Sequence, residues 1–313
     1  MSLHQLPQKS DWLACQHIAR THGRSFYLAS RLLGPEQRRS ILAAYAFCRL
    51  ADDVVDQAGG RVRERWSVLY GWECQLELPR HPVAIAFADV RERYGIPDEP
   101  VRELFEGIRA DLTISRYNTW PELRHYCHLV AGTVGLIVAP ILGCRNPHAL
   151  PLAAELGIAM QLTNILRDVR EDAEMGRIYL PLDELAAFGI DPESLLAGQP
   201  GDTFPDLLRL QIERARGLYA HALSGVSALS ANGRLTTLVA AELYAGILDQ
   251  IEANRYDVFA QRAVVGRAAK MSKLVQASAR FIRSTASSTN TEASTSPNGR
   301  LFPSEADAEG CTG

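Results

Sequence analysis

The stretch that decides the fold is residues 161–181, QLTNILRDVREDAEMGRIYLP, together with the lead-in LAAELGIAMQL over residues 152–162. The lead-in is almost entirely apolar, which predicts a helix over residues 150–174 that begins inside the protein. On this helix Asn164, Asp168 and Asp172 follow one another at intervals of four residues and therefore share one face. An unpaired buried carboxylate costs several kcal/mol, so this face needs a cation or a basic partner.

A second stretch, residues 41–56 with the sequence ILAAYAFCRLADDVVD, repeats this pattern. Tyr45, Arg49, Asp52 and Asp56 are spaced by four, three and four residues and share one face of a predicted helix whose other positions are mostly apolar. Two such helices packed face to face would place carboxylate and amide oxygens on both sides of one space. Magnesium prefers such oxygen ligands and commonly shares a substrate phosphate, so we expect a magnesium site between the two helices.

Helical periodicity dominates the rest of the chain, and strand patterns are nearly absent. Glycine and proline divide it into further predicted helices, over residues 10–28, 61–78, 83–94, 99–116, 207–230 and 235–253, with an extended stretch at 176–180. From residue 285 the composition shifts to Ser, Thr, Asn and Gly, which bury too little apolar area to order a chain. We therefore expect one all-α domain over residues 1–284, a helical bundle, and a disordered tail over residues 285–313.

The longest uncharged run is LVAGTVGLIVAPILGC, residues 129–144. It is shorter than the roughly 20 apolar residues of a membrane-spanning helix and contains three glycines and a proline, so it is predicted to be a buried helix. Its small residues allow either a close contact with a neighbouring helix or the close approach of a ligand.

Composition excludes several function classes. The chain has 33 basic and 36 acidic residues and a net charge of -3, so we expect no nucleic-acid partner. Only three of the basic residues are lysines; arginine suits bidentate phosphate contacts, although codon bias explains the same preference.

The six cysteines form no CxxC pair and are expected to be reduced thiols. The first residues lack an apolar signal segment, so a cytoplasmic location is expected.

Residues 122–128 offer an alternative metal site. Glu122 and His125 form a Glu-x-x-His pattern, and His128 follows one turn later. A di-iron bundle requires two such motifs with partner glutamates, and the sequence contains one, so this alternative carries little weight.

Four blocks of sequence resemble the squalene and phytoene synthase family. They are HGRSFYLAS at residues 22–30, YAFCRLADDVVD at 45–56, YCHLVAGTVG at 126–135 and NILRDVRED followed by GRIYLP at 164–181. The resemblance runs from about His22 to about Arg262. It implies an isoprenoid-synthase-type helical bundle with a central apolar cavity, and a cofactor of Mg²⁺, with Mn²⁺ as an alternative and without NADPH.

The resemblance also implies roles for individual residues. Metal ions and diphosphate would be bound by Asp52, Asp56, Asn164, Asp168 and Asp172, and four of these residues, all but Asn164, would be catalytic together with Tyr126. Arginines would contact diphosphate oxygens at positions Arg49, Arg167 and Arg262. The substrate chamber would be lined by Ser25, Phe26, Tyr45, Tyr126, Val130, Gln161, Tyr179 and Tyr244.

The implied reaction joins two prenyl diphosphates head to head through a cyclopropyl intermediate. The blocks are most similar to bacterial phytoene synthases, which condense two geranylgeranyl diphosphates to phytoene in carotenoid biosynthesis. The alternative is a thirty-carbon synthase that uses farnesyl diphosphate to make squalene, dehydrosqualene or presqualene diphosphate. Because the product is so apolar, we also expect peripheral contact with the inner face of the cell membrane and transfer of the product to a downstream desaturase.

Overall fold

The computed structural model describes residues 6–57 and 62–288, with side chains described at 6–53 and 63–282. Within these ranges the chain is helical, and its one strand-like pairing is an isolated parallel bridge between Arg116 and Ile178, where an extended stretch is predicted. The helices are α1 (Lys9–His22), α2 (Arg24–Ala29), α3 (Pro35–Gln57), α4 (Val62–Glu73), α5 (Pro82–Tyr94), α6 (Asp98–Ala110), α7 (Trp120–Cys127), α8 (Thr133–Ile141), α9 (Leu150–Arg167), α10 (Val169–Glu174), α11 (Leu182–Ala187), α12 (Pro192–Leu196), α13 (Phe204–Ala222), α14 (Ala231–Ala253) and α15 (Arg267–Ser288). The all-α prediction is confirmed.

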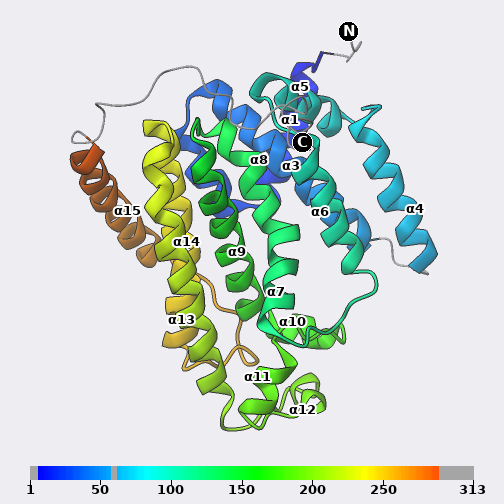
Figure 1. Cartoon of the computed structure of the whole chain (residues 1–313), viewed down its shortest axis with the longest axis vertical. Helices are drawn as coiled ribbons and strands as arrows, with labels where there is room; N and C mark the ends of the chain where they lie inside the picture. The colour runs from blue at the N-terminus through cyan, green and yellow to red at the C-terminus, as the bar shows by residue number, and fades with distance from the viewer. Residues whose placement is uncertain (1–5, 58–61, 289–313) are drawn as a thin grey trace, which may run out of the picture.

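Helix α9 runs through the middle of the bundle and packs against α8, α13 and α14 (Figure 1). One apolar cluster joins its buried side to α13 and to α11 and α12, and a second cluster unites α1, α3, α5, α6 and α8. The segment Pro147–Arg167, which contains α9, is long and apolar enough to cross a membrane by length and composition alone. In the bundle, 56% of its most apolar 18-residue stretch is buried, as expected for the central helix of a folded domain.

Glycines bring the segment before and within α8 into backbone contact with α9. A Cβ atom on Gly135 would lie 2.1 Å from the carbonyl oxygen of Ala153, and one on Gly157 would lie 2.0 Å from that of Ala131. Both distances are far below van der Waals contact, so larger residues would force the helices apart. The segment before α8, His128–Gly132, is a π-helical turn, a feature that often occurs at functional sites.

The predicted helix boundaries are wrong at several places. The helix predicted over residues 99–116 ends at Ala110, and the one predicted over 207–230 ends at Ala222. The helix predicted over residues 150–174 bends at Asp168 (φ -105°, ψ 17°), which separates α9 from α10, although the backbone N–H of Asp168 still donates to the Asn164 carbonyl at 2.9 Å. The helix predicted over 10–28 is interrupted at Gly23. Helix α15 was not predicted, and it continues to Ser288, past the expected domain boundary at 284; residues 289–313 of the expected tail lie outside the described residues.

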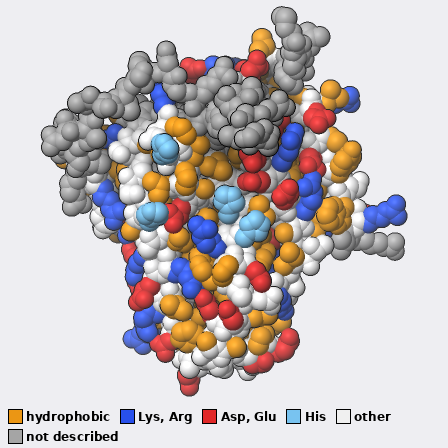
Figure 2. Space-filling view, viewed as in Figure 1, with side chains coloured by type: hydrophobic (Ala, Val, Ile, Leu, Met, Phe, Trp, Pro, Cys, Tyr) orange, Lys and Arg blue, Asp and Glu red, His pale blue; other side chains and the backbone are white. Residues whose placement is uncertain are grey.

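The surface in the direction of Figure 1 is of mixed character. Acidic and basic side chains are interspersed with apolar ones over the helices, and several histidines gather near the middle of this face (Figure 2).

Candidate active site

Asp168, at the bend between α9 and α10, is held by two arginines. Arg167 donates to both of its carboxylate oxygens, at 2.7 Å from Nε and 2.5 Å from Nη2. Arg262, from the segment before α15, donates to Oδ1 at 2.8 Å from Nε and 2.7 Å from Nη2, and its Nε also lies 3.5 Å from Glu171. Two of the three predicted diphosphate-binding arginines, Arg167 and Arg262, thus contact one carboxylate.

Asn164 lies one turn before Asp168 and has an unused acceptor. Its Nδ2 donates to the Gln161 side-chain oxygen at 3.3 Å. Its Oδ1 is buried and has no hydrogen-bond partner among the described residues. A buried polar atom left unpaired costs about 1 to 3 kcal/mol, so this oxygen marks a place for a ligand.

The α3 carboxylates are arranged differently from the prediction. Asp53, which the spacing argument passed over, is buried; Arg49 donates to it, and His22 Nδ1 lies 3.8 Å from it. The Asp52 side chain is 47% exposed and lies 3.7 Å from Arg49. The predicted ligand Asp56 belongs to α3, but its side chain lies outside the described residues.

Tyr244 of α14 lies near charged side chains of both α9 and α3. Burial raises the pKa of its hydroxyl, while the charges of Arg167 and Arg49 act to lower it. The hydroxyl therefore lies within electrostatic range of arginines from both α9 and α3. Charged groups of α3 and of α9 thus act on the same buried hydroxyl of α14.

Asp172 and Tyr126 belong to a neighbouring cluster centred on Asp111. Tyr126 donates to Asp111 Oδ2 at 2.8 Å and Tyr179 donates to Oδ1 at 3.0 Å. Burial, and next the charge of the Asp168 carboxylate, raise the pKa of Asp172 to about 7, although Arg177 opposes them. Burial and Asp111 likewise raise the pKa of Tyr126 well above its usual range. These acids repel one another, which a bound cation would relieve.

An apolar cavity of about 210 Å³ opens beside these charges. Five predicted site residues line it, namely Phe26, Tyr45, Gln161, Asn164 and Tyr244. The glycine-containing segment contributes Ala131, Val134, Gly135 and Val138, so it serves both as a close helix contact and as a cavity wall. Four predicted chamber residues are not among the described lining residues, namely Ser25, Tyr126, Val130 and Tyr179. Tyr126 and Tyr179 contact Asp111 instead, and Val130 packs against Gly107 of α6.

Residues 19–269 match the squalene/phytoene synthase family. The chain belongs to this family. A phytoene synthase of Arthrospira platensis is 42% identical over 277 residues, which cover 82% of this chain and 89% of that protein. A chloroplast phytoene synthase of Arabidopsis thaliana is 40% identical over 88% of this chain and 67% of its own length. A crystal structure of a dehydrosqualene synthase with a ligand superimposes with a TM-score of 0.82 at 31% identity, over 88% of this chain and 98% of that chain.

Family membership accounts for the prenyl diphosphate chemistry and for a general need for a divalent metal ion. Among the side chains that the structure describes, no group of three or more His, Cys, Asp and Glu residues is assembled to hold a metal ion. Arginines contact the carboxylates of Asp53 and Asp168. The donor chemistry nevertheless fits a hard divalent cation, because the unpaired Asn164 oxygen lies one helical turn before the Asp168 carboxylate and Asp172 follows one turn later.

Sequence reasoning missed several residues of this squalene/phytoene synthase site. Asp53 carried a usable signal, since it follows Arg49 by four residues, the spacing of a helical ion pair. Asp111 and Arg177 carried none, because their partners lie in distant segments. Thr236 and Thr237 of α14 also line the cavity, and their buried hydroxyls find no hydrogen-bond partner within the described part of the chain.

Proposed function

We propose that this chain condenses two geranylgeranyl diphosphates head to head, through a cyclopropyl diphosphate, to phytoene, with release of diphosphate. The observation that carries the proposal is the position of the charged groups. Asn164 lines a cavity whose described walls contain no charged side chain, and Asp168, paired with Arg167 and Arg262, follows Asn164 by one helical turn. A prenyl diphosphate has the same division, a charged head on a long hydrocarbon tail. The phytoene synthases at about 40% identity favour geranylgeranyl diphosphate over farnesyl diphosphate.

In this proposal Arg49, Arg167 and Arg262 bind diphosphate oxygens, and the arginine fork is suited to bidentate contact with phosphate. Asp52, Asp56, Asn164, Asp168 and Asp172 would hold Mg²⁺, which supplies electrostatic stabilisation of the departing diphosphate. The cavity wall is mostly apolar and carries no charged side chain, which disfavours water that would otherwise quench an allylic cation to an alcohol. Phe26 and Tyr45, whose rings stack at 4.8 Å, present aromatic faces that stabilise a nearby cation.

The Asp111 cluster has a separate part in this proposal. Tyr126 and Tyr179 both donate to Asp111, so their hydroxyls stay protonated. The rings of Tyr117, Tyr126 and Tyr179 pack against one another and form a wall beside Asp172. We propose that this wall positions Asp172. Tyr126 therefore acts through Asp111 and the neighbouring rings.

The test is to incubate the purified protein with geranylgeranyl diphosphate and Mg²⁺, without NADPH, and to identify the lipid product by mass. A forty-carbon triene is expected. Formation of a thirty-carbon hydrocarbon or a cyclopropyl diphosphate from farnesyl diphosphate alone would overturn the substrate assignment and leave the family intact. Replacing Mg²⁺ by Mn²⁺ in parallel tests which cation supports turnover.

We further propose that the protein works at the inner face of the cell membrane and passes its product to a desaturase. The support is chemical, because a forty-carbon hydrocarbon partitions into lipid. Helix α15 offers a surface for such contact, since Met271, Val275 and Ile282 are each more than 60% exposed on it. Flotation of the purified protein with liposomes, compared with the variant Met271→Ser/Val275→Ser, tests this surface.

A further inference from the structure

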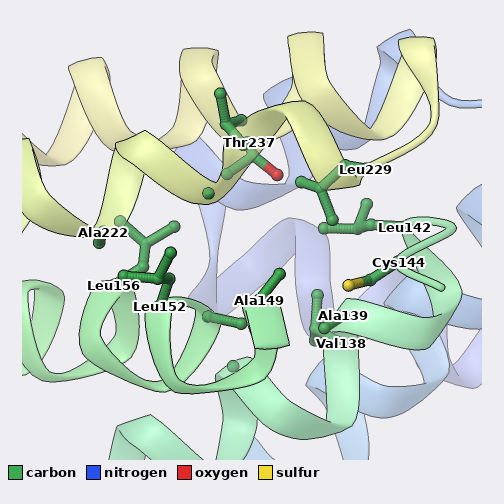
Figure 3. A pocket seen from close by; sticks show the side chains of 14 residues that line it. Val138, Ala139, Leu142, Cys144, Ala149, Leu152, Leu156, Ala222, Leu229 and Thr237 are labelled. Atoms are coloured by element: carbon green, nitrogen blue, oxygen red, sulfur yellow. The ribbon is translucent and has the colours of Figure 1, made fainter. Parts of the chain in front are cut away.

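A second, smaller cavity of about 80 Å³ continues the apolar space beyond its first part (Figure 3). The two cavities share wall residues at their junction, namely Gly135, Val138, Leu142, Ala153, Leu156 and Thr237. In Figure 3, Leu152 and Leu156 rise from α9 toward Thr237 of α14. The smaller cavity is therefore an extension of the larger one past a neck of side chains.

Helix α9 runs alongside both cavities. Asn164 and Gln161 line the larger cavity, Leu156 and Ala153 line the neck, and Ala149, directly before α9, lines the smaller cavity. At about 1.5 Å per residue, the path along the helix from Asn164 to Ala149 is roughly 22 Å long. The charged end and the far end of the space are thus set by a single rigid element, suited to measuring the length of a chain.

Part of the wall of the smaller cavity is a close contact between Leu152 of α9 and Gly225. A Cβ atom on Gly225 would lie 2.5 Å from Cδ1 of Leu152, so the absence of a side chain at position 225 lets Leu152 occupy this place. The adjoining walls carry small side chains, including Ala139, Ala149 and Ala222, and the described lining contains no charged residue. The smaller cavity is therefore lined mainly by hydrocarbon, with the Thr237 hydroxyl at its junction with the larger cavity.

We propose that the smaller cavity receives the terminal isoprene unit of one of the two substrate chains, and that Leu152, positioned by Gly225, ends the tunnel and selects chain length. This inference rests on the proposed function, because it assigns the smaller cavity to the fourth isoprene unit of a geranylgeranyl chain whose diphosphate lies near Asp168. A farnesyl chain, one unit shorter, does not reach this cavity. Side chains beyond the neck therefore affect the longer substrate alone.

The test uses two opposite variants. Ala222→Leu fills the smaller cavity and should lower the ratio of kcat/KM for geranylgeranyl over farnesyl diphosphate by about tenfold or more, the usual effect of a lost hydrocarbon subsite. Leu152→Ala opens the end and should raise the use of geranylfarnesyl diphosphate relative to geranylgeranyl diphosphate by about tenfold. The matched control is Ala240→Leu, because Ala240 lines only the larger cavity, where added bulk should impair all three substrates alike.

The outcomes separate this inference from the proposed function. If wild-type protein makes phytoene but Ala222→Leu and Leu152→Ala both leave its substrate ratios unchanged, the inference is wrong and the proposed function stands. If wild-type protein makes only thirty-carbon product, the substrate assignment fails and this inference fails with it. Should Ala222→Leu fold poorly, judged by its thermal unfolding, the ratio measured with Leu152→Ala decides the question.

Discussion

Two carboxylates in this protein are held in nearly the same way, each between two cations, yet they belong to regions of different character. Asp168 lies between Arg167 and Arg262 beside the cavity. Glu242 of α14 is 5% exposed and lies between Lys273 at 3.7 Å and Arg280 at 2.9 Å, both from α15. The local chemistry of the two sites does not distinguish them.

What differs is the surroundings. Around Glu242, apolar side chains of α14 and α15, such as Leu238, Leu243 and Ala277, pack together, so the ion pairs complete an interface. Around Asp168, the Asn164 oxygen is unpaired in the described structure, Asp172 has a raised pKa, and an apolar cavity begins. A buried charge pair is thus a candidate for function when unsatisfied polar atoms and open space lie next to it, and a structural link when neither does.

Of the substitutions that compare the two regions, Asp168→Asn should have the largest effect, a loss of activity. The substitution removes the charge that both arginines contact and a proposed metal ligand, so kcat/KM should fall by on the order of a thousandfold, comparable with the loss of a principal electrostatic group. Diphosphate release at saturating Mg²⁺ measures the effect, and thermal unfolding should show a folded protein. The control is Asp206→Asn, an exposed pair with Arg209, which should retain wild-type turnover. Normal activity of Asp168→Asn would remove Asp168 from the site.

Glu242→Gln should give the opposite result. It leaves Arg280, which is 49% exposed, facing an uncharged partner, while Lys273 keeps Asp249 at 2.6 Å, so the free energy of unfolding should fall by about 2 kcal/mol. Because the side chain points to α15 and does not line the cavity, kcat/KM measured well below the melting temperature should stay within about twofold of wild type. Urea unfolding beside Glu213→Gln, an exposed position of α13, checks the first part. A large loss of turnover without loss of stability would contradict the structural assignment of Glu242.

Asn164→Leu sharpens the distinction with a smaller effect. The amide makes one hydrogen bond, to Gln161, so an apolar residue of similar size should keep the fold. Removing the unpaired oxygen should raise the Mg²⁺ concentration needed for half-maximal turnover by about tenfold, at the low end of the effects of lost metal-site contacts. Asn164→Asp, which keeps an oxygen donor, should restore most of the response. An unchanged Mg²⁺ dependence in Asn164→Leu would show that the oxygen serves no cation.

The features that local periodicity encodes could be predicted from the sequence. The helical class, the central position of α9 and the shared face of Asn164, Asp168 and Asp172 all follow from spacing within one segment. Even the bend at Asp168 left these three residues near one another, because the backbone hydrogen bonds continue across it at 2.9 Å. Arg167 and Arg262, which the family resemblance assigns to diphosphate binding, both contact Asp168.

What depends on contacts between distant segments could not be predicted. Asp111 belongs to the site because Tyr126 and Tyr179 reach it from other segments, and no spacing encodes that meeting. The end of the tunnel depends on Gly225 approaching Leu152. Helix α15 was missed because its buried stripe is narrow, with Leu274, Ala277 and Phe281 as its apolar contacts, and because the charges that fix it lie on α14.

Acid should weaken the α14–α15 interface by a small amount. Asp249 of α14 accepts from Lys273 at 2.6 Å and from Arg216 at 3.0 Å. Burial raises the pKa of Asp249, but the contacts with these two cations together outweigh burial, so the pKa lies below its ordinary value. Its stabilisation is therefore present above the unfolded-state pKa of about 3.9 and is lost as the pH falls through the lower folded-state pKa. Since the side chain is 48% exposed, the contribution should stay below about 1 kcal/mol.

Urea unfolding from about pH 6 down to about pH 2.5 measures this contribution. Wild-type protein should lose more stability than Asp249→Asn over the lowest part of this range, while the two should follow parallel curves above about pH 5, where Asp249 is ionised in both the folded and the unfolded state. Identical slopes throughout would mean that Asp249 adds nothing to the interface. In that case the Glu242 pairs would be the ionic contacts that stabilise the α14–α15 interface, which makes the contrast between Glu242 and Asp168 sharper.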